Sequence, residues 1–344
     1  MLITFSFIIT AFLLALSLTY YLSRPSAVLY IIDTPNERSL HTQPTPRSGG
    51  LGILFSLLVL IPSSYFVYNI NAPIFHWIAL SVLIIALISF VDDCMDVSAL
   101  YRFVLHFIAA AILLIQADLW IIELSIASYT VSLPFIIAVP VSLLFIVWMV
   151  NLYNFMDGMD GFSGGMSVIG FASFALIGAW QQQFEFMLFN ALIASASLGF
   201  LWCNFPPARI FMGDAGASSL GFLAAGMSLW AQKLEIIPLW LSLLLFSPFI
   251  IDATMTLLRR LLQGEKIWQA HRSHYYQRLV QLGWGHKKTV LVEYVLMLVC
   301  SLSTLFILQL PTALHWQMGV LWIMTYIFFI YAVNYLEAKS EEIS

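Results

Sequence analysis

Charged residues are scarce in this chain of 344 residues: they make up 9% of it, against about 25% in an ordinary soluble domain. A chain that is 61% hydrophobic is not solvated as a globule, so we expect the lipid bilayer to be its solvent. The formal net charge is only −4, and no basic face typical of a nucleic-acid-binding protein is visible. These shortages exclude a soluble globular domain and argue against a nucleic-acid partner.

Cysteine is also rare. Cys94, Cys203 and Cys300 lie far apart, in or beside apolar stretches, and match no metal-binding spacing, so we interpret them as small hydrophobic residues. The N-terminal segment lacks the basic start and the small-residue cleavage site of a signal peptide. Its apolar run of about 20 residues is long enough to cross a bilayer, which predicts a retained first helix.

Eleven apolar stretches have about the length that a helix needs to cross a hydrocarbon core about 30 Å thick. These predicted spans are 3–22, 49–69, 75–91, 101–117, 133–152, 163–181, 185–203, 215–231, 236–257, 290–309 and 315–335. Residues 118–132 are too few for another span and predict a short hairpin or an interfacial segment. The sequence thus predicts an all-α polytopic membrane protein with one integral-membrane domain over 1–336 and a polar tail over 337–344.

Basic residues give this arrangement an orientation. With the N-terminus outside, the inner segments are 23–48, 92–100, 153–162, 204–214, 258–289 and 336–344. Of the 14 Lys and Arg residues, all except Lys233 lie in these segments or at the inner end of a span, as the positive-inside rule requires. We therefore expect the N-terminus outside, the C-terminus in the cytoplasm, and an active site at the cytoplasmic face, where nearly all the unusual polar residues lie.

Two neighbouring carboxylates, Asp92 and Asp93, stand at the inner end of the third predicted span, with Asp96 close behind. Adjacent carboxylates repel one another, and acids in a membrane protein are costly unless they have partners or a function. A cation or a substrate proton between them would relieve the repulsion. The alternative interpretation is a solvated helix end.

Asn151, Asn154 and Asp157 recur at i, i+3 and i+6, which places them along one flank of a helix near its inner end. Several glycines follow between residues 158 and 165 and let the backbone approach a ligand closely. Oxygen donors beside a glycine-rich turn suit a hard cation such as Mg²⁺ and a diphosphate. The alternative is a helix terminus that is simply rich in turn-forming residues.

Asp214 opens the eighth predicted span, after a loop that Pro206 and Pro207 keep non-helical. One interpretation of Asp214 is a helix cap. The other is a metal ligand at a helix N-terminus whose backbone N–H groups face a phosphate, with Arg209 placed to help with anionic charge.

The long inner loop 259–288 is basic and carries His271, Arg272 and His274 among tryptophan and tyrosine residues. A general attraction to lipid headgroups is one interpretation of this loop. The other is a clamp over a nucleotide diphosphate, because hydrogen bonds from cationic side chains to phosphate are strong.

Together these segments resemble, in order, the polyprenyl-phosphate N-acetylhexosamine-1-phosphate transferases of glycosyltransferase family 4. That family includes the bacterial enzyme that makes lipid-linked GlcNAc and the phospho-MurNAc-pentapeptide translocase. The resemblance runs from about residue 33 to about residue 280. It is carried by DTPNERSLHTQPTPRSGGLGI (33–53), the VDD that ends at Asp93, NLYNFMDGMDGFSGG (151–165), IFMGDAGASSLGF (210–222), and the spacing from Asp252 to Gly264 followed by HRSHYYQRL (271–279).

The resemblance implies roles for individual residues. Asn154 and Asp214 are the implied ligands of Mg²⁺, with Mn²⁺ as an alternative metal, and Asp92 and Asp93 are implied to be catalytic. The predicted substrate-binding residues are Asn151, Asp157, Arg209, His271, Arg272 and His274.

The chain departs from the family at Tyr275 and Tyr276, where many members have further histidines, and at Ala217, where serine is usual. The form HRSHYYQRL is similar to enzymes that initiate O-antigen synthesis, including those for 6-deoxy sugars. The implied function is transfer of an N-acetylhexosamine-1-phosphate from its UDP derivative, either GlcNAc or a 6-deoxy sugar such as FucNAc or QuiNAc, to undecaprenyl phosphate. UMP is released, and O-antigen or another cell-envelope polysaccharide is begun at the bacterial inner membrane.

The expected partners are a UDP-N-acetylhexosamine, undecaprenyl phosphate, membrane lipids and a second copy of the chain in a homodimer, with no nucleic acid. The main rival function is a transporter or lipid flippase, which should place charge near the bilayer midplane. Here the acids lie at the inner helix ends, which favours the transferase. A membrane phosphatase, a second rival, would work by hydrolysis and need no nucleotide.

Overall fold

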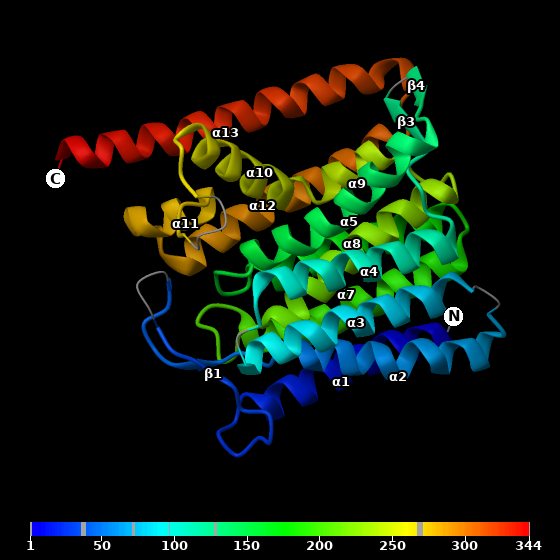
Figure 1. Ribbon diagram of the computed structural model, residues 1–344, viewed down its shortest axis with the longest axis horizontal. Helices are drawn as coiled ribbons and strands as arrows, with labels where there is room; N and C mark the ends of the chain where they lie inside the picture. Colours follow the sequence, from blue (N-terminus) through cyan, green and yellow to red (C-terminus); the bar gives the residue numbers. More distant parts are fainter. Residues whose placement is uncertain are drawn as a thin grey trace.

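The computed structural model describes residues 2–35, 39–70, 73–95, 97–126, 129–266 and 271–343. Long helices lie side by side in one bundle (Figure 1). The helices are α1 (Leu2–Leu22), α2 (Gly50–Tyr68), α3 (Ile74–Met95), α4 (Ala99–Ala117), α5 (Phe135–Met156), α6 (Phe162–Trp180), α7 (Phe184–Asn204), α8 (Asp214–Lys233), α9 (Leu239–Leu245), α10 (Ser247–Leu262), α11 (Tyr275–Leu279), α12 (Gly285–Ile307) and α13 (His315–Ile343). The prediction of a helical chain is confirmed.

Each of the predicted spans coincides with a helix or a helix pair. Within the described ranges, nine helices are long and apolar enough to cross a membrane, or up to ten if the bent pair α9–α10 counts as one span. The predicted span that is missing from this count is 215–231, which corresponds to α8. This helix is buried continuously from Ala215 to Ala231 and is rich in glycine, alanine and serine. Because α8 faces protein rather than lipid, it does not need a lipid-compatible surface.

The predicted span 236–257 is not one straight helix. It consists of α9 and α10, which meet at Phe246 with a bend of 85°. Pro248 lies in the first turn of α10, where a backbone N–H would have no partner within the helix in any case. In the interior of a helix continuing from α9, the same proline would remove a hydrogen bond and clash with the preceding turn. The prediction of a single continuous helix here is therefore wrong.

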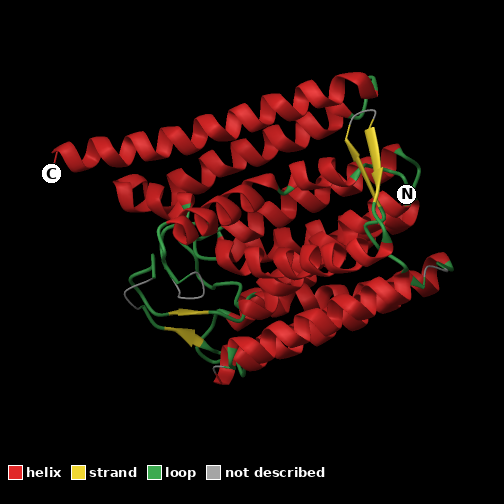
Figure 2. Ribbon diagram, turned by 45° about the horizontal axis from the view of Figure 1, so that its top comes forward, coloured by secondary structure: helices red, strands yellow, loops and turns green. Residues whose placement is uncertain are grey.

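Two short antiparallel hairpins complete the fold (Figure 2). Strands β3 (Glu123–Ile126) and β4 (Tyr129–Ser132) form the hairpin predicted for 118–132, with Glu123 opposite Ser132. Strands β1 (Ile32–Asp33) and β2 (Thr45–Pro46) pair in the polar loop before α2. The two hairpins lie at opposite ends of the bundle (Figure 2).

Successive helices alternate in direction, so the α1–α2, α3–α4, α5–α6, α7–α8 and α10–α11 connections gather at one end, on the left of Figure 1. We call this the site end. The N-terminus and the β3–β4 hairpin lie at the opposite end (Figure 1). The C-terminus lies at the site end, and α13 continues as a helix to Ile343, through most of the tail predicted over 337–344.

Helix α8 lies between α3 and α5 and fixes where the site residues meet. Gly221 makes this possible, since a Cβ there would press on the α5 backbone at Met149 and Val150. Gly216 lies equally close to Gly50 at the start of α2. These close approaches bring the first residue of α8 beside the last turns of α3 and α5, which carry the predicted site residues.

Candidate active site

Asp93, in the last turn of α3, is buried against the N-terminus of α8. Its carboxylate accepts the backbone N–H groups of Asp214 and Ala215, each at 3.3 Å, and its side chain is 4% exposed. The first N–H groups of a helix have no partner within the helix. Asp93 therefore supplies from a neighbouring helix the cap that Asp214 itself does not provide, since α8 has no capping side chain of its own.

Asp214 has different partners. Its Oδ2 accepts a hydrogen bond from Nδ2 of Asn154 at 3.1 Å and lies 3.2 Å from Nη1 of Arg102 on α4. The same Arg102 nitrogen also pairs with Asp92. The two predicted metal ligands therefore lie together, and a guanidinium bridges the carboxylates of Asp92 and Asp214. Arg102 therefore relieves repulsion between Asp92 and Asp214, which is a different pair from Asp92 and Asp93, for which the sequence predicted a cation or a proton.

Arg47 approaches the cluster from the loop before α2. It donates from Nη2 to the backbone oxygen of Asp93 at 2.7 Å, and its Nε lies 3.7 Å from the Asp93 carboxylate. The loop is held by backbone hydrogen bonds to the α7–α8 connection: Phe211 N–H to Pro46 O at 2.7 Å and Gly49 N–H to Phe211 O at 2.9 Å. Two motifs that are far apart in sequence, 33–53 and 210–222, therefore form one surface.

Gly213 joins these two segments. Its φ of +76° is in the region that favours glycine, and a Cβ there would overlap the carbonyl oxygen of Arg47. The same Cβ would lie 3.1 Å from the Asp93 carboxylate. Gly213 therefore allows the loop, the buried carboxylate and the start of α8 to meet at one point.

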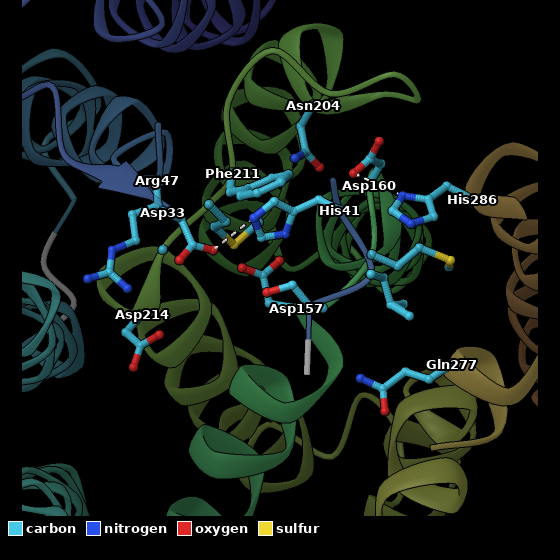
Figure 3. A pocket seen from close by; sticks show the side chains of 16 residues that line it. Asp33, His41, Arg47, Asp157, Asp160, Asn204, Phe211, Asp214, Gln277 and His286 are labelled. Carbon is cyan, nitrogen blue, oxygen red and sulfur yellow. Dashed lines mark ion pairs between the residues drawn. The ribbon is translucent and has the colours of Figure 1, made fainter. Parts of the chain in front are cut away.

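A polar cavity of about 190 Å³ opens beside this point (Figure 3). Asp157 lies centrally among the labelled side chains, with Arg47 and Asp214 to one side and His286 to the other (Figure 3). The lining consists of Asp33, Ser39, Leu40, His41, Arg47, Asp157, Gly158, Met159, Asp160, Asn204, Phe211, Met212, Gly213, Asp214, Gln277 and His286. The predicted residues Asp157 and Asp214 line it, whereas Asp93 lies behind Gly213.

Asp157 follows the last residue of α5, as the predicted helix flank requires. Burial raises the pKa of its carboxyl well above the usual value, and the carboxylates of Asp214 and Asp93 raise this pKa further. A carboxyl group with such a pKa is poised to exchange a proton or to gain a cationic partner when a ligand enters.

Two aspartate–histidine pairs form part of the cavity lining and were not predicted as site residues. His41 lies 3.7 Å from Asp33, and His286 lies 3.1 Å from Asp160. The rings of His41 and Phe211 pack in a T-shaped arrangement with centroids 4.9 Å apart. Asp160 does fall within the motif 151–165, and His41 within 33–53, but nothing in the spacing distinguished them from neighbouring polar residues.

Asn204 and Gln277 also line the cavity without having been predicted. Asn204 ends α7, where its Oδ1 accepts the N–H of Gly161 at 2.9 Å and its Nδ2 donates to the carbonyl of Ile210 at 2.9 Å. It thus ties the α5–α6 turn to the α7–α8 connection. Gln277 lies on α11, one turn after His274.

His274 is buried and holds α11 in place. Its Nδ1 lies 3.1 Å from the Asp252 carboxylate, which also accepts the N–H groups of Tyr275 at 3.0 Å and Tyr276 at 2.9 Å. Asp252 thus binds the first turn of α11 to α10. Tyr276 donates from its hydroxyl to the carbonyl of Phe155 at 3.2 Å, close to the Asp157 turn. His274 does not line the cavity in the described part of the chain.

The remaining predicted substrate-binding residues are spread over the site end. Asn151 donates to the carbonyl of Val147 within α5, while Arg209 and Arg272 are exposed. His271 contacts Ser273, and burial, together with cationic neighbours, lowers the pKa of His271 to about 4. None of these side chains belongs to the cavity lining among the described residues, so their roles stay predictions.

The donors at the start of α8 suit Mg²⁺ in their chemistry. Asp214, Asp92 and Asn154 offer only oxygen ligands, which hard divalent cations prefer. No three Asp, Glu, His or Cys side chains converge as a ready ligand set anywhere in the ranges that the structure describes. Arg102 occupies the space between Asp92 and Asp214, so a metal bound by both would displace its guanidinium.

The chain is similar to several known proteins. Residues 74–232 match glycosyl transferase family 4. Over 94% of its length, the chain is 28% identical to the probable undecaprenyl-phosphate N-acetylglucosaminyl 1-phosphate transferase of Bacillus subtilis (strain 168), covering 87% of that protein. It is 28% identical to the decaprenyl-phosphate N-acetylglucosaminephosphotransferase of Mycobacterium tuberculosis (strain CDC 1551 / Oshkosh), over 79% of this chain and 74% of that one.

A third similar protein has a different sugar in its name. The phospho-N-acetylmuramoyl-pentapeptide-transferase of Staphylococcus saprophyticus is 29% identical, over 76% of this chain and 85% of that one. The chain is thus similar to transferases of this superfamily over most of its length. The stretch that matches family 4 contains Asp92, Asp93, Asn154, Asp157 and Asp214, which are the residues that the fold gathers around α8.

Proposed function

We propose that this family 4 transferase moves an N-acetylhexosamine-1-phosphate from a UDP-sugar onto undecaprenyl phosphate and releases UMP. The observation that supports this most directly is the polar cavity at the site end, which Asp157, Asp214 and Arg47 line together. Arginine and aspartate side chains pair beside this cavity, at one end of a bundle whose helices are long and apolar enough to cross a bilayer. The named polyprenyl-phosphate relatives act in the same chemical class.

In the proposed reaction, an oxygen of the lipid phosphate attacks the β-phosphorus of the UDP-sugar. The bond from the β-phosphorus to the bridging oxygen breaks, and UMP leaves with that oxygen. A phosphate monoester has a second pKa near 6, so the lipid phosphate is already largely ionised at neutral pH. Asp92 or Asp93 removes a last proton or positions the phosphate; the buried contacts of Asp93 with α8 and Arg47 favour positioning.

Mg²⁺ held by Asp214 and Asn154 would offset the negative charge of the diphosphate, since phosphoryl transfer depends chiefly on positioning and electrostatics. Arg47 and Arg102 lie in the same cluster and supply fixed positive charge. Phe211 and Asn204 both line the cavity, and an aromatic ring together with an amide is a combination that suits a nucleobase. The arrangement serves a nucleoside diphosphate better than a simple phosphate ester.

We further propose a class of sugar and a pathway for this reaction. The segment HRSHYYQRL supports a UDP-N-acetylhexosamine such as GlcNAc, FucNAc or QuiNAc, used to begin O-antigen or another envelope polysaccharide. The distribution of lysine and arginine supports a site end that faces the cytoplasm of a bacterial inner membrane.

Purified protein tests the reaction class. UMP release should require a UDP-sugar, undecaprenyl phosphate and a divalent cation together, and EDTA should stop it. UDP-GlcNAc, UDP-FucNAc, UDP-QuiNAc and UDP-GalNAc are compared to identify the sugar. Folded protein that releases UMP with none of them, yet moves a lipid across a vesicle membrane, would make the protein a flippase instead.

A further inference from the structure

Helix α4 buries a histidine whose ring has no hydrogen-bond partner. His106 is 5% exposed, and neither of its ring nitrogens makes a hydrogen bond within the described ranges. The buried stripe of α4 continues through Ala109, Ala110 and Leu113, so an apolar residue would serve the packing equally well. Buried polar groups in native proteins nearly always have a partner, because an unpaired one is costly. His106 therefore needs an explanation other than packing.

His106 follows Arg102 by one helical turn. Residues four apart on an α-helix are neighbours on one face, with a rise of about 6 Å between them. Side chains on a helix also point back toward its N-terminus, which directs the ring of His106 toward Arg102. Arg102 lies near the start of α4, at the site end, and is 30% exposed. The buried imidazole thus lies behind the residue that carries the guanidinium.

Arg102 contacts an oxygen that a divalent cation would need. Its Nη1 pairs with Asp92 and lies 3.2 Å from Oδ2 of Asp214. The same Oδ2 accepts a hydrogen bond from Asn154 at 3.1 Å. A divalent cation bound to Asp214 and Asn154 would therefore compete with the guanidinium for one oxygen, and the two positive charges would repel each other. Binding of the cation requires that the guanidinium move away.

A guanidinium that leaves two carboxylates needs another acceptor. Arginine stays charged and carries only donors, and a charged donor beside apolar side chains is costly unless an acceptor meets it. A neutral imidazole has one acceptor nitrogen. Since both ring nitrogens of His106 are without a partner in the described part of the chain, His106 offers Arg102 such an acceptor on the same face of α4.

We infer that His106 is a positioning residue that gives Arg102 a second position. In the first position, which the structure shows, Arg102 bridges Asp92 and Asp214. In the second, which accompanies a divalent cation at Asp214, Arg102 donates to the acceptor nitrogen of His106. The inference rests on the proposed function and adds how the acidic cluster releases its own cation to take up a metal.

Mg²⁺ binding to the protein without substrates tests the inference. A ligand of the folded state raises the thermal midpoint by mass action, so EDTA-stripped protein is titrated with Mg²⁺ and the concentration that raises the midpoint by a fixed increment is measured. His106→Leu removes the acceptor and should increase this concentration about tenfold, the scale of a hydrogen bond to a charged group. His106→Gln keeps an acceptor oxygen and should retain the wild-type requirement.

Thr304→Val on α12 is the matched control. Thr304 is also buried, and its hydroxyl also has no hydrogen-bond partner within the described ranges. This variant should keep the wild-type Mg²⁺ requirement, because α12 carries none of the carboxylates that Arg102 bridges. Removing an unpaired polar group need not destabilise a fold, so we expect His106→Leu to fold, and His106→Met repeats the test if it does not.

Arg102→Gln separates a positioning role from a structural one. Without a guanidinium to relocate, adding His106→Leu should leave the Mg²⁺ requirement of Arg102→Gln protein unchanged, since the double variant measures the coupling between the two residues. An equal effect of His106→Leu in both backgrounds would make His106 a structural residue only and overturn the inference. A wild-type Mg²⁺ requirement in His106→Leu would overturn it too, as would a wild-type midpoint that does not respond to Mg²⁺.

UMP release distinguishes failure of this inference from failure of the proposed function. Lipid-dependent UMP release with the same Mg²⁺ requirement in wild type and His106→Leu leaves the reaction standing and removes the second position of Arg102. Midpoint shifts that depend on Arg102 and His106 as expected, in protein that releases no UMP from any UDP-sugar tested, leave the second position standing and remove the proposed function.

Discussion

Replacing Asp214 by asparagine should remove activity with little effect on stability. The contacts of Asp214 to Arg102 and Asn154 are made by a side chain that is 32% exposed, and an exposed ion pair contributes about 0–1 kcal/mol. Loss of its charge at the N-terminus of α8 adds about 0.3–1 kcal/mol. Relief of repulsion with Asp92 acts in the opposite sense. The expected loss in the free energy of unfolding is therefore about 1 kcal/mol, or a few degrees in the thermal midpoint.

The expected loss of activity is much larger. In the proposed reaction Asp214 would act by holding the Mg²⁺ that offsets the charge of the diphosphate, and losing one preorganised charge-stabilising group costs roughly 100- to 1,000-fold in kcat. UMP release at saturating substrates measures it, and thermal unfolding in the same detergent measures stability. The side-chain volume is nearly unchanged, so packing around α8 should persist.

Asp93→Asn is the matched comparison. Asp93 is buried, accepts two backbone N–H groups of α8 and pairs with Arg47. Breaking a buried pair costs about 3–5 kcal/mol, so this variant should lose stability as well as activity. Asp214→Asn with kcat within tenfold of wild type, or with a stability loss equal to that of Asp93→Asn, would refute the separation of roles drawn from the structure.

Three further predictions concern the surroundings of the site. Arg102→Gln should lower the Mg²⁺ concentration needed for half-maximal activity in an EDTA-stripped preparation, because the guanidinium no longer competes for the carboxylates; a higher requirement would contradict this. The buried Arg278 of α11 pairs with Glu337 of α13, so Arg278→Glu should lower the thermal midpoint and activity, and adding Glu337→Arg should restore part of both; no rescue would mean the pair is not what holds α11. The pKa of His271 is about 4 in the folded protein and about 6.5 in an unfolded chain, so the folded state loses stability relative to the unfolded state as the pH drops from 6.5 to 4. The thermal midpoint of His271→Gln should therefore fall less over this pH range than the thermal midpoint of the wild type.

Local spacing predicted the parts of the site that lie within one motif. Asn154 and Asp157 stand at the end of α5 because a three-residue spacing on a helix keeps polar side chains on one flank. The hairpin β3–β4 was one of two alternatives for residues 118–132, which are too few for a span. Apolar run length located the long helices, because a bilayer imposes a similar length on each of them, but it indicated neither the bend between α9 and α10 nor the short helix α11 within the predicted loop 258–289.

Contacts between distant segments could not be predicted in this way. Nothing in the sequence indicates that Arg102 bridges Asp92 and Asp214, since this depends on how α3, α4 and α8 pack. The sequence left open whether Asp214 caps α8, and the answer lies on another helix, in Asp93. His274 was predicted to bind the substrate, yet in the structure its side chain pairs with Asp252.

The fate of the β-phosphate distinguishes transfer of a sugar-1-phosphate from transfer of the sugar alone. UDP-GlcNAc, or the sugar that the panel identifies, is labelled with ³²P at the β-phosphate and incubated with the protein, undecaprenyl phosphate and Mg²⁺. We predict that the label moves into the lipid phase while unlabelled UMP appears in the aqueous phase in equal amount. Label that stays in the aqueous phase as UDP would mean that the sugar alone is transferred, and would contradict the proposed reaction.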